Sequence, residues 1–463
     1  MKELSRDSPL AAVSPLDGRY ADKTADLVPY ASEAALIEAR LRVEVAYLLA
    51  LADVDGVDCE VDQAERSHLR EVVDGFDADD AALVKRIETE GTEEFAATNH
   101  DVKAVEYFLR TETPERLHPW IHFGLTSEDV NNLAHRLNAK GAVETVLLPE
   151  IESIRDALTE LAREHREVPM LARTHGQPAT PTTFGKEMAV FAARLGRSEA
   201  RLRAATAALS GKLAGASGTY AAHVAAYPDV DWRAFSAAFV DDLGLDHTPL
   251  ATQINPCDDL AALFDALAGV NNVLLDLDRD VWRYVSDRYL GQESDASETG
   301  SSTMPHKVNP IDFENSEGNL SKANSALTFL RDYVTSSRLQ RDLSDSTVKR
   351  NVGTAFAHCL IGYRKTATGL GKVVPNEQVM REELEATPEI IGEAVQTILR
   401  REGDTEAYER VKALTRGQRV TLDGFRELFD DLDVDESVRA ELRELTPARY
   451  TGVASELVDE LDE

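Results

Sequence analysis

The apolar residues between 260 and 285 follow an unbroken helical repeat. They recur at steps of three and four, at Leu260, Leu263, Leu267, Val270, Leu274, Leu277, Val281 and Val285. Such steps place these side chains on one face of a helix of about seven turns. A helix this long with a continuous apolar stripe needs long partners to cover it, so the repeat predicts a bundle of long helices.

Further segments carry the same kind of periodicity, at about 147–161, 184–209, 313–334 and 352–370. Shorter helical patterns with Pro and Gly breaks come before and after them, and strand-like alternation is sparse. We therefore predict an all-α fold of three helical domains, at 1–115, 116–365 and 366–463. The central domain is expected to be a bundle of long antiparallel helices.

The charge of the chain is strongly acidic and evenly spread. There are 83 acidic and 50 basic residues, of which 13 are lysine, for a net charge of −33. A dispersed acidic excess with scarce lysine is typical of a very salty cytoplasm, where about 1 M salt screens repulsion beyond about 3 Å. A halophilic origin is the expectation, and an ordinary acidic cytosolic protein is the alternative. No nucleic acid partner is expected, because phosphate backbones need basic patches.

The N-terminal segment and the cysteines indicate a cytoplasmic protein. MKELSRDSPL lacks the apolar stretch of a signal peptide, and no run of about 18 residues is uniformly apolar, as a membrane span requires. Cys59, Cys257 and Cys359 are odd in number, far apart and without a CxxC pair. Neither a zinc site nor a disulfide framework is therefore expected.

Polar islands rich in Gly and Pro interrupt the helical patterns, and loops held by a rigid scaffold are where chemistry usually lies. The island at 300–309 reads GSSTMPHKVN. Its hydroxyls, Lys307 and Asn309 make a poor packing unit, but together with backbone N–H groups they suit a carboxylate. From the residues alone, a solvated polar loop is the alternative.

A second island, at 337–350, reads SRLQRDLSDSTVKR and is basic in an acidic chain. Its side chains of interest are Arg338, Arg341, Ser346, Thr347 and Arg350. Guanidinium forks match phosphate oxygens, so a phosphate site would explain the composition. A salt-bridged helix face is the alternative reading.

Four further islands lie earlier in the chain. His175 lies between two predicted helices in RTHGQPATPTTFGK, where no apolar face claims it. Asn99 and Ser127 stand where helix N-caps are expected, in the segments NHDVK and HFGLTSED. The segment DGRY lies near the N-terminus, at 17–20.

These strings together resemble a known family. GSSxMPxKxNP is typical of the fumarase/aspartase superfamily, and the strings RTHGQPATPTTFGKE and QRDLSDSTV narrow the resemblance to adenylosuccinate lyases. The likeness spans about 14–370, in order and spacing, and is closest to the longer bacterial form. It implies a carbon–nitrogen lyase that eliminates fumarate from adenylosuccinate, giving AMP. It also implies the same elimination from the succinylated aminoimidazole carboxamide ribotide (SAICAR), giving AICAR, in purine nucleotide biosynthesis.

The resemblance also assigns roles to residues. His175 is the general acid that protonates the leaving nitrogen, and Ser301 is the base that removes the carbon proton, activated by its surroundings. The choice of Ser301 over Ser302 rests on the family alone. The residues implied in substrate binding are Arg19, Tyr20, Asn99, His100, Asp101, Thr126, Ser127, Gln253, Ser302, Lys307, Val308, Asn309, Asn315, Arg341, Ser346, Thr347 and Arg350. Cys257 stands where relatives carry a histidine, and no role is assigned to it.

The resemblance implies a homotetramer whose active sites draw on several subunits, purine nucleotides as small-molecule substrates, and no metal or organic cofactor. The first alternative is argininosuccinate lyase or another lyase of the superfamily, which needs no phosphate site at 338–350. The second is a non-catalytic structural paralogue, which would be free to lose Ser301, His175 or Lys307.

Overall fold

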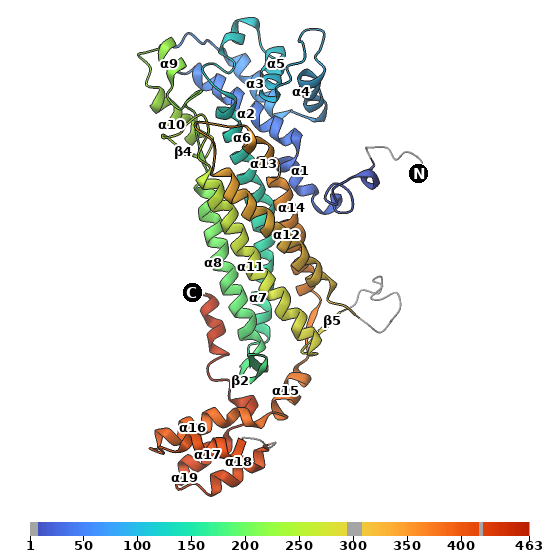
Figure 1. The fold of residues 1–463 in the computed structure, drawn as a ribbon, viewed down its shortest axis with the longest axis vertical. Coiled ribbons are helices and arrows are strands. Elements are labelled where there is room, and N and C mark those ends of the chain that lie inside the picture. Colours follow the sequence, from blue (N-terminus) through green and yellow to red (C-terminus); the bar gives the residue numbers. More distant parts are fainter. Residues whose placement is uncertain (1–7, 294–307, 416–419, 463) are drawn as a thin grey trace. The chain divides into compact units, whose positions relative to one another are not determined.

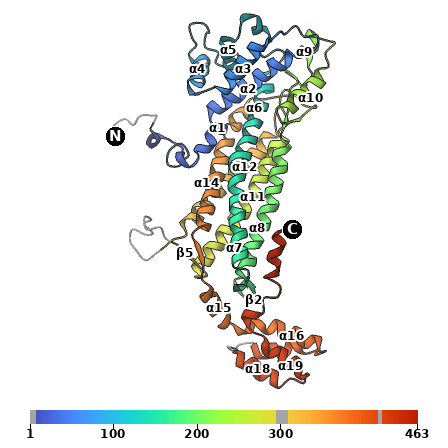
Figure 2. The same cartoon turned by 180° about the vertical axis from the view of Figure 1, so that it is seen from behind.

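A computed structural model describes residues 8–293, 308–415 and 420–462 of the chain. The long helices predicted from the periodicity are α7 (Leu148–Glu164), α8 (Phe184–Ala207), α11 (Asp258–Ser286), α12 (Ile311–Val334) and α14 (Val352–Leu370). Successive long helices run in opposite directions (Figures 1 and 2). The predicted all-α fold with long antiparallel helices is confirmed.

The other α-helices precede, connect and follow these five. They are α1 (Val28–Ala31), α2 (Glu33–Leu51), α3 (Gln63–Asp74), α4 (Ala78–Thr89), α5 (Asp101–Thr111), α6 (Ser127–Ala142), α9 (Ala221–Ala226), α10 (Trp232–Asp242), α13 (Ser344–Lys349), α15 (Glu377–Glu385), α16 (Gly392–Arg401), α17 (Ala407–Thr415), α18 (Leu422–Asp430) and α19 (Glu436–Glu444). The short 3-10 helices are η1 (Pro9–Ala11), η2 (Ala21–Lys23), η3 (Ala25–Leu27), η4 (Glu115–Trp120), η6 (Pro388–Ile391), η7 (Pro447–Arg449) and η8 (Glu456–Asp462).

One helix begins earlier than the periodicity predicts. The pattern at 147–161 suggests a start near Leu147, but α6 continues into α7 through a π-helical turn, η5 (Val143–Leu147). Pro149 lacks an N–H and normally breaks a helix interior. The wider turn just before it carries the helix past this residue.

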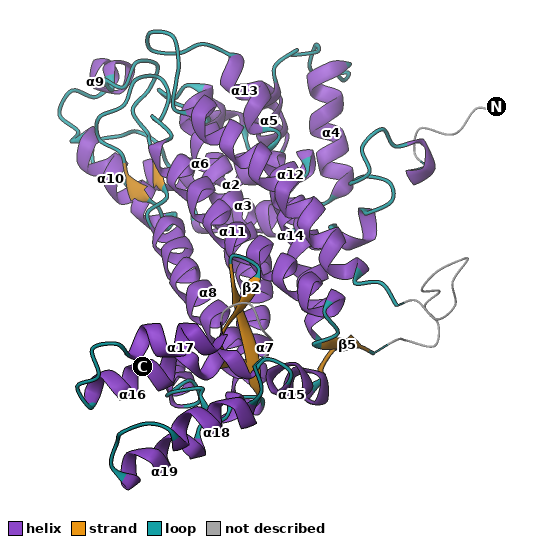
Figure 3. Cartoon of the chain, turned by 60° about the horizontal axis from the view of Figure 1, so that its bottom comes forward, coloured by secondary structure: helices purple, strands orange, loops and turns teal. Residues whose placement is uncertain are grey.

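The strands in the described residues form two-stranded sheets (Figure 3). β1 (Pro169–Thr174) and β2 (Gln177–Thr183) make an antiparallel hairpin, with a register shift between Leu171 and Arg173. β3 (Ser210–Gly211) pairs in parallel with β4 (Asp246–His247), and β5 (Leu290–Gln292) pairs antiparallel with β6 (Val373–Pro375). The hairpin is the island of His175, so this segment between helices is a defined turn.

The contacts within the chain group its residues into two compact units. Unit 1 comprises 1–151, 198–272 and 318–363, and unit 2 comprises 152–197, 273–317 and 364–463. The division into domains at 1–115, 116–365 and 366–463 stays a prediction.

Unit 1 holds α2 and α6 together around small and polar side chains. Leu36 and Ala39 of α2 pack on Ala134 of α6, and Arg40 Nε donates to Asn131 Oδ1 at 2.8 Å. Gly141 permits α1 to approach, because a Cβ at this position would lie 2.5 Å from Tyr30 Cε1. This packing holds the N-terminal half of α2, which carries Arg40, against α6.

Unit 2 contains its own apolar core and a polar contact between long helices. Buried residues of α16 to α19, including Val395, Phe425 and Leu442, form one core cluster. Asp278 of α11 accepts from Thr366 Oγ1 of α14 at 3.0 Å, and the Thr366 and Ser316 hydroxyls are 2.8 Å apart. All three side chains are buried.

α11 is long and apolar enough to cross a membrane by length and composition alone. Within the described residues, 56% of its most apolar window is buried inside the protein. Its stripe from Leu260 to Val281 is almost fully covered. A mostly buried stripe is that of a core helix in a bundle.

Candidate active site

The N-terminal ends of α5 and α6 lie next to each other in unit 1. His100 caps α5 because its Nδ1 accepts from the backbone N–H of Lys103 at 3.2 Å. With Nδ1 accepting, the neutral ring carries its proton on Nε2, which is 3.4 Å from Ser127 Oγ. Two predicted segments are thus brought together, at helix ends whose partial positive charge favours anions.

The residues that cap α5 and α6 differ from the predicted ones. Asn99 and Ser127 are expected as N-caps, but the capping positions are His100 and Thr126. Asn99 has a φ of +48°, a left-handed conformation that asparagine tolerates. It turns the chain one residue before the cap. Ser127 is the first residue of α6, and Asp129 accepts from the Thr126 N–H at 2.9 Å.

Asp101 is the centre of an ion-pair cluster. Its Oδ2 lies 2.7 Å from Arg40 Nη2 and 2.9 Å from Arg350 Nη2. Burial pushes the pKa of Asp101 up, but the charges of Arg40 and Arg350 and the N–H of Val102 outweigh it and hold the pKa below its ordinary value. The carboxylate therefore stays charged at neutral pH and joins α2, α5 and the end of α13.

Arg341 links two other predicted segments. Its Nη1 donates to Gln253 Oε1 and its Nη2 to Glu128 Oε1, both at 3.2 Å. The Gln253 amide in turn donates to the Ala216 carbonyl at 3.1 Å. The basic island is therefore salt-bridged in this structure, and Arg341 and Arg350 lie in the same part of unit 1 as His100 and Asp101.

A buried ion pair stabilises the contacts between Gln253 and the start of α6. Lys212 Nζ lies 2.8 Å from Asp129 Oδ1, and both side chains are fully buried. Asp129 also accepts from the N–H groups of Ala214 and Gly215, and Lys212 donates to the Gln253 carbonyl at 2.7 Å. Burial lowers the pKa of Lys212, and the charge of Asp129 opposes that effect. The pair positions Gln253 relative to the start of α6.

A second buried pair, between His122 and Glu44, was not predicted from the sequence. His122 Nδ1 is 2.6 Å from Glu44 Oε1, and Glu106 lies 3.9 Å from its other nitrogen. Burial lowers the pKa of His122, but the charge of Glu44 and its hydrogen bond outweigh it and raise the pKa above its ordinary value. The sequence does hold a signal for buried charges of this kind. Arg40, Glu44 and Asp129 fall on the buried faces of α2 and α6.

Other predicted residues of unit 1 lie farther out. Ser346 is half-buried and Thr347 exposed, both on α13. Arg19 is exposed, and Tyr20 precedes η2. Within the described part of the chain, no hydrogen bond or ion pair joins Arg19 or Tyr20 to the Asp101 cluster.

Unit 2 carries the remaining described residues. His175 is exposed at the turn of the β1–β2 hairpin, with a φ of +53°. Arg173 in this hairpin pairs with Glu383 of α15. Val308 and Asn309 directly precede α12, and Asn315 lies in its first turns.

Ser301, Ser302 and Lys307 lie outside the described residues. Their roles, and that of His175, stay predictions.

Comparisons with known proteins first show the class of enzyme to which the chain belongs. A family model described as lyase matches residues 18–324. The fold resembles a fumarate lyase from Mesorhizobium, with a TM-score of 0.74, 23% identity, and coverage of 95% of this chain and 97% of that one. It also resembles a 3-carboxy-cis,cis-muconate lactonizing enzyme from Pseudomonas putida, with a TM-score of 0.73, 21% identity, and coverage of 94% and 96%. The protein is a lyase.

The substrate family follows from closer relatives. A model of the adenylosuccinate lyase C-terminal region matches residues 337–451. Adenylosuccinate lyases from Haemophilus influenzae and Escherichia coli K12 are each 46% identical to the chain, over 98% of its length and 99% of theirs. The chain belongs to the adenylosuccinate lyase family.

Proposed function

We propose that this enzyme eliminates fumarate from adenylosuccinate, giving AMP, and from SAICAR, giving AICAR, in the cytoplasm. The observation that carries the proposal is the 46% identity to adenylosuccinate lyases over nearly the full length of both chains. The arginines of unit 1 support it, because Arg341 and Arg350 lie at the helix ends that carry His100 and Ser127.

The chemistry needs one base, one acid and a site for developing negative charge. Ser301 removes the proton from the carbon next to a succinyl carboxylate, and the electrons are held on that carboxylate as an aci-carboxylate. The bond from the neighbouring carbon to nitrogen then breaks, and His175 protonates the departing nitrogen. Imidazole suits that step because it exchanges protons near neutrality.

The anionic groups of the substrate have matching donors in unit 1. Thr126 and Ser127 at the start of α6 offer a helix N-terminus and a hydroxyl to a succinyl carboxylate. Arg350 and Ser346 offer a guanidinium and a hydroxyl to the 5′-phosphate. His100 contacts Ser127 and Asp101 contacts Arg350, while Gln253 contacts Arg341; these three residues are assigned to the purine and ribose.

Parallel assays with adenylosuccinate and argininosuccinate test the proposal. We expect fumarate from adenylosuccinate alone, because argininosuccinate carries no phosphate for Arg350. Fumarate from argininosuccinate alone would establish the rival lyase. Fumarate from neither compound, in folded protein, would favour the non-catalytic paralogue.

Replacing Arg350 with Gln is expected to raise the KM for adenylosuccinate by about tenfold or more, because a charged hydrogen bond to phosphate is lost. The matched control is Arg338→Gln, since Arg338 is 83% exposed and pairs with Asp342, at 3.6 Å. Steady-state kinetics of both variants check this. An unchanged KM in the Arg350 variant would remove this residue from the phosphate site.

We further propose a homotetramer with shared active sites that needs high salt. The net charge of −33 per chain repels itself, and this repulsion grows when salt is removed. Light scattering and thermal melts should show a tetramer in molar KCl, and dissociation or a melting temperature lower by several degrees after desalting. Equal stability and mass in both buffers would contradict the halophilic account.

A further inference from the structure

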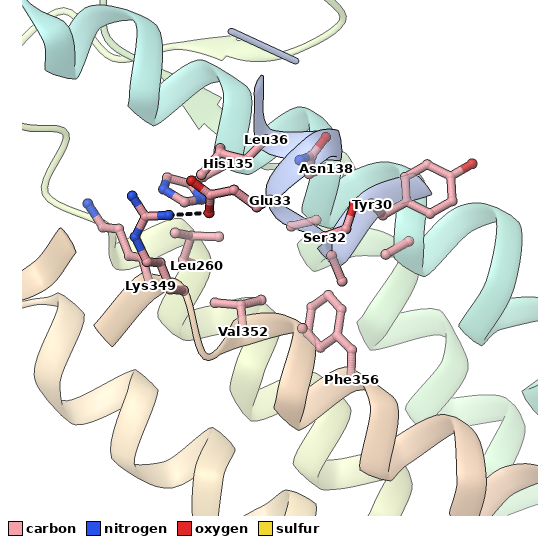
Figure 4. A pocket seen from close by; sticks show the side chains of 15 residues that line it. Tyr30, Ser32, Glu33, Leu36, His135, Asn138, Leu260, Lys349, Val352 and Phe356 are labelled. Atoms are coloured by element: carbon pink, nitrogen blue, oxygen red, sulfur yellow. Dashed lines mark hydrogen bonds and ion pairs between the residues drawn. The ribbon is translucent and has the colours of Figure 1, made fainter. Parts of the chain in front are cut away.

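A pocket in unit 1 has a charged end and an apolar end (Figure 4). Glu33, His135 and Lys349 lie at the charged end, together with Arg350. Val352 and Phe356 of α14 lie at the other end. Glu33 is the first residue of α2 and has no role in the mechanism above.

Glu33 is the second carboxylate on Arg350. Nη1 of Arg350 pairs with Glu33 Oε2, while Nη2 donates to Asp101 Oδ2 at 2.9 Å. Asp101 is also shared with Arg40, at 2.7 Å. Two guanidinium groups thus face two carboxylates, and the group carries no net positive charge.

The His135 ring at the charged end of the pocket is surrounded by basic side chains that carboxylates pair with. Burial lowers the pKa of the His135 ring, and the charges of Lys349, Arg40, Arg136 and Arg350 lower it further, well below its ordinary value. Lys349 is itself buried and held by Asp345 at 2.6 Å. Glu33 differs from the other carboxylates here because 42% of its side chain is exposed, so it can leave Arg350 at little cost.

We propose that Glu33 is the counter-ion that the substrate phosphate replaces on Arg350. A carboxylate and a phosphate accept hydrogen bonds from the same N–H groups of a guanidinium, so they compete for them. In the free enzyme Glu33 orients Arg350 and keeps its charge balanced. On binding, the phosphate must displace Glu33, which weakens the hold on the substrate and on the monophosphate product. This inference rests on the proposed function.

The variant Glu33→Gln tests the exchange, because it keeps the shape and removes the charge. Calorimetric titration with AMP should show binding roughly two- to fivefold tighter than in the wild type, the range of a half-exposed ion pair. Adenosine, which lacks the phosphate, should bind as before. The matched control is Glu38→Gln on the same helix, whose carboxylate pairs with Arg42 at 3.4 Å. This variant should leave both affinities unchanged.

A double variant separates exchange from a general effect on folding. In an Arg350→Gln background, adding Glu33→Gln should no longer tighten AMP binding, because the shared partner is gone. AMP affinity that is unchanged or weaker in Glu33→Gln, or a gain that persists without Arg350, would overturn the inference. Absence of both AMP binding and fumarate release in the wild type would instead overturn the proposed function.

Discussion

Replacing His175 with Asn is expected to lower kcat by about 10²- to 10⁴-fold, the usual contribution of a general acid. Asparagine cannot supply a proton at neutral pH, so nitrogen would leave as a poorly stabilised anion. It also accepts the left-handed backbone at this turn, where φ is +53°, better than alanine does. The exposed position of His175 predicts an unchanged fold.

The controls for this experiment are structural and chemical. His68→Asn changes another exposed histidine, on α3, and should leave kcat unchanged. Circular dichroism should match between both variants and the wild type. A companion variant, Ser301→Ala, is expected to lose activity to a similar degree. Full turnover in either His175→Asn or Ser301→Ala would remove that residue from its assigned role.

Replacing Asp278 with Asn is expected to stabilise the protein at alkaline pH. Burial raises the pKa of Asp278 from 3.8 to about 7, against the hydrogen bonds from Ser316 and Thr366. Its Oδ2 is buried without a hydrogen-bond partner among the described residues. A charged carboxylate at this position is therefore poorly compensated.

The direction in which stability changes with pH follows from the raised pKa of Asp278. The contribution of Asp278 to stability is complete below 3.8, where the acid is neutral in both states, and it is lost as the pH rises through about 7. The full loss is about 4 kcal/mol. Asparagine never ionises, so the stability gained by the variant should be about 2–3 kcal/mol larger at pH 8 than at pH 5.

Urea unfolding at the two pH values measures this difference. Asp276→Asn is the matched control, since this side chain is 52% exposed on the same helix and pairs with Arg194. The control should give the same small change at both pH values. An equal effect of Asp278→Asn at pH 5 and pH 8 would show that Asp278 does not titrate in this range.

The long helices are predictable because their information is local. Steps of three and four residues fix the face of α11 whatever surrounds it. The continuation of α6 into α7 is not predictable this way, because Pro149 reads as a break and only the π-helical turn before it shows otherwise. The β1–β2 hairpin is likewise hidden, since Gly, Pro and Thr predict a turn without defining its pairing.

The candidate site is likewise only partly predictable from the sequence. The sequence predicts His100, Asp101, Arg341 and Arg350 because they lie in strings that carry the family resemblance. Their partners lie far along the chain: Arg40 is 61 residues from Asp101, and Gln253 is 88 residues from Arg341. Buried pairs such as Lys212 with Asp129 carry no local pattern, because each charge looks like a surface residue until its partner is known.

The elimination reaction is tested by product analysis with purified enzyme and adenylosuccinate in molar KCl. We expect equimolar release of fumarate and AMP. Folded, tetrameric protein that releases neither product would contradict it.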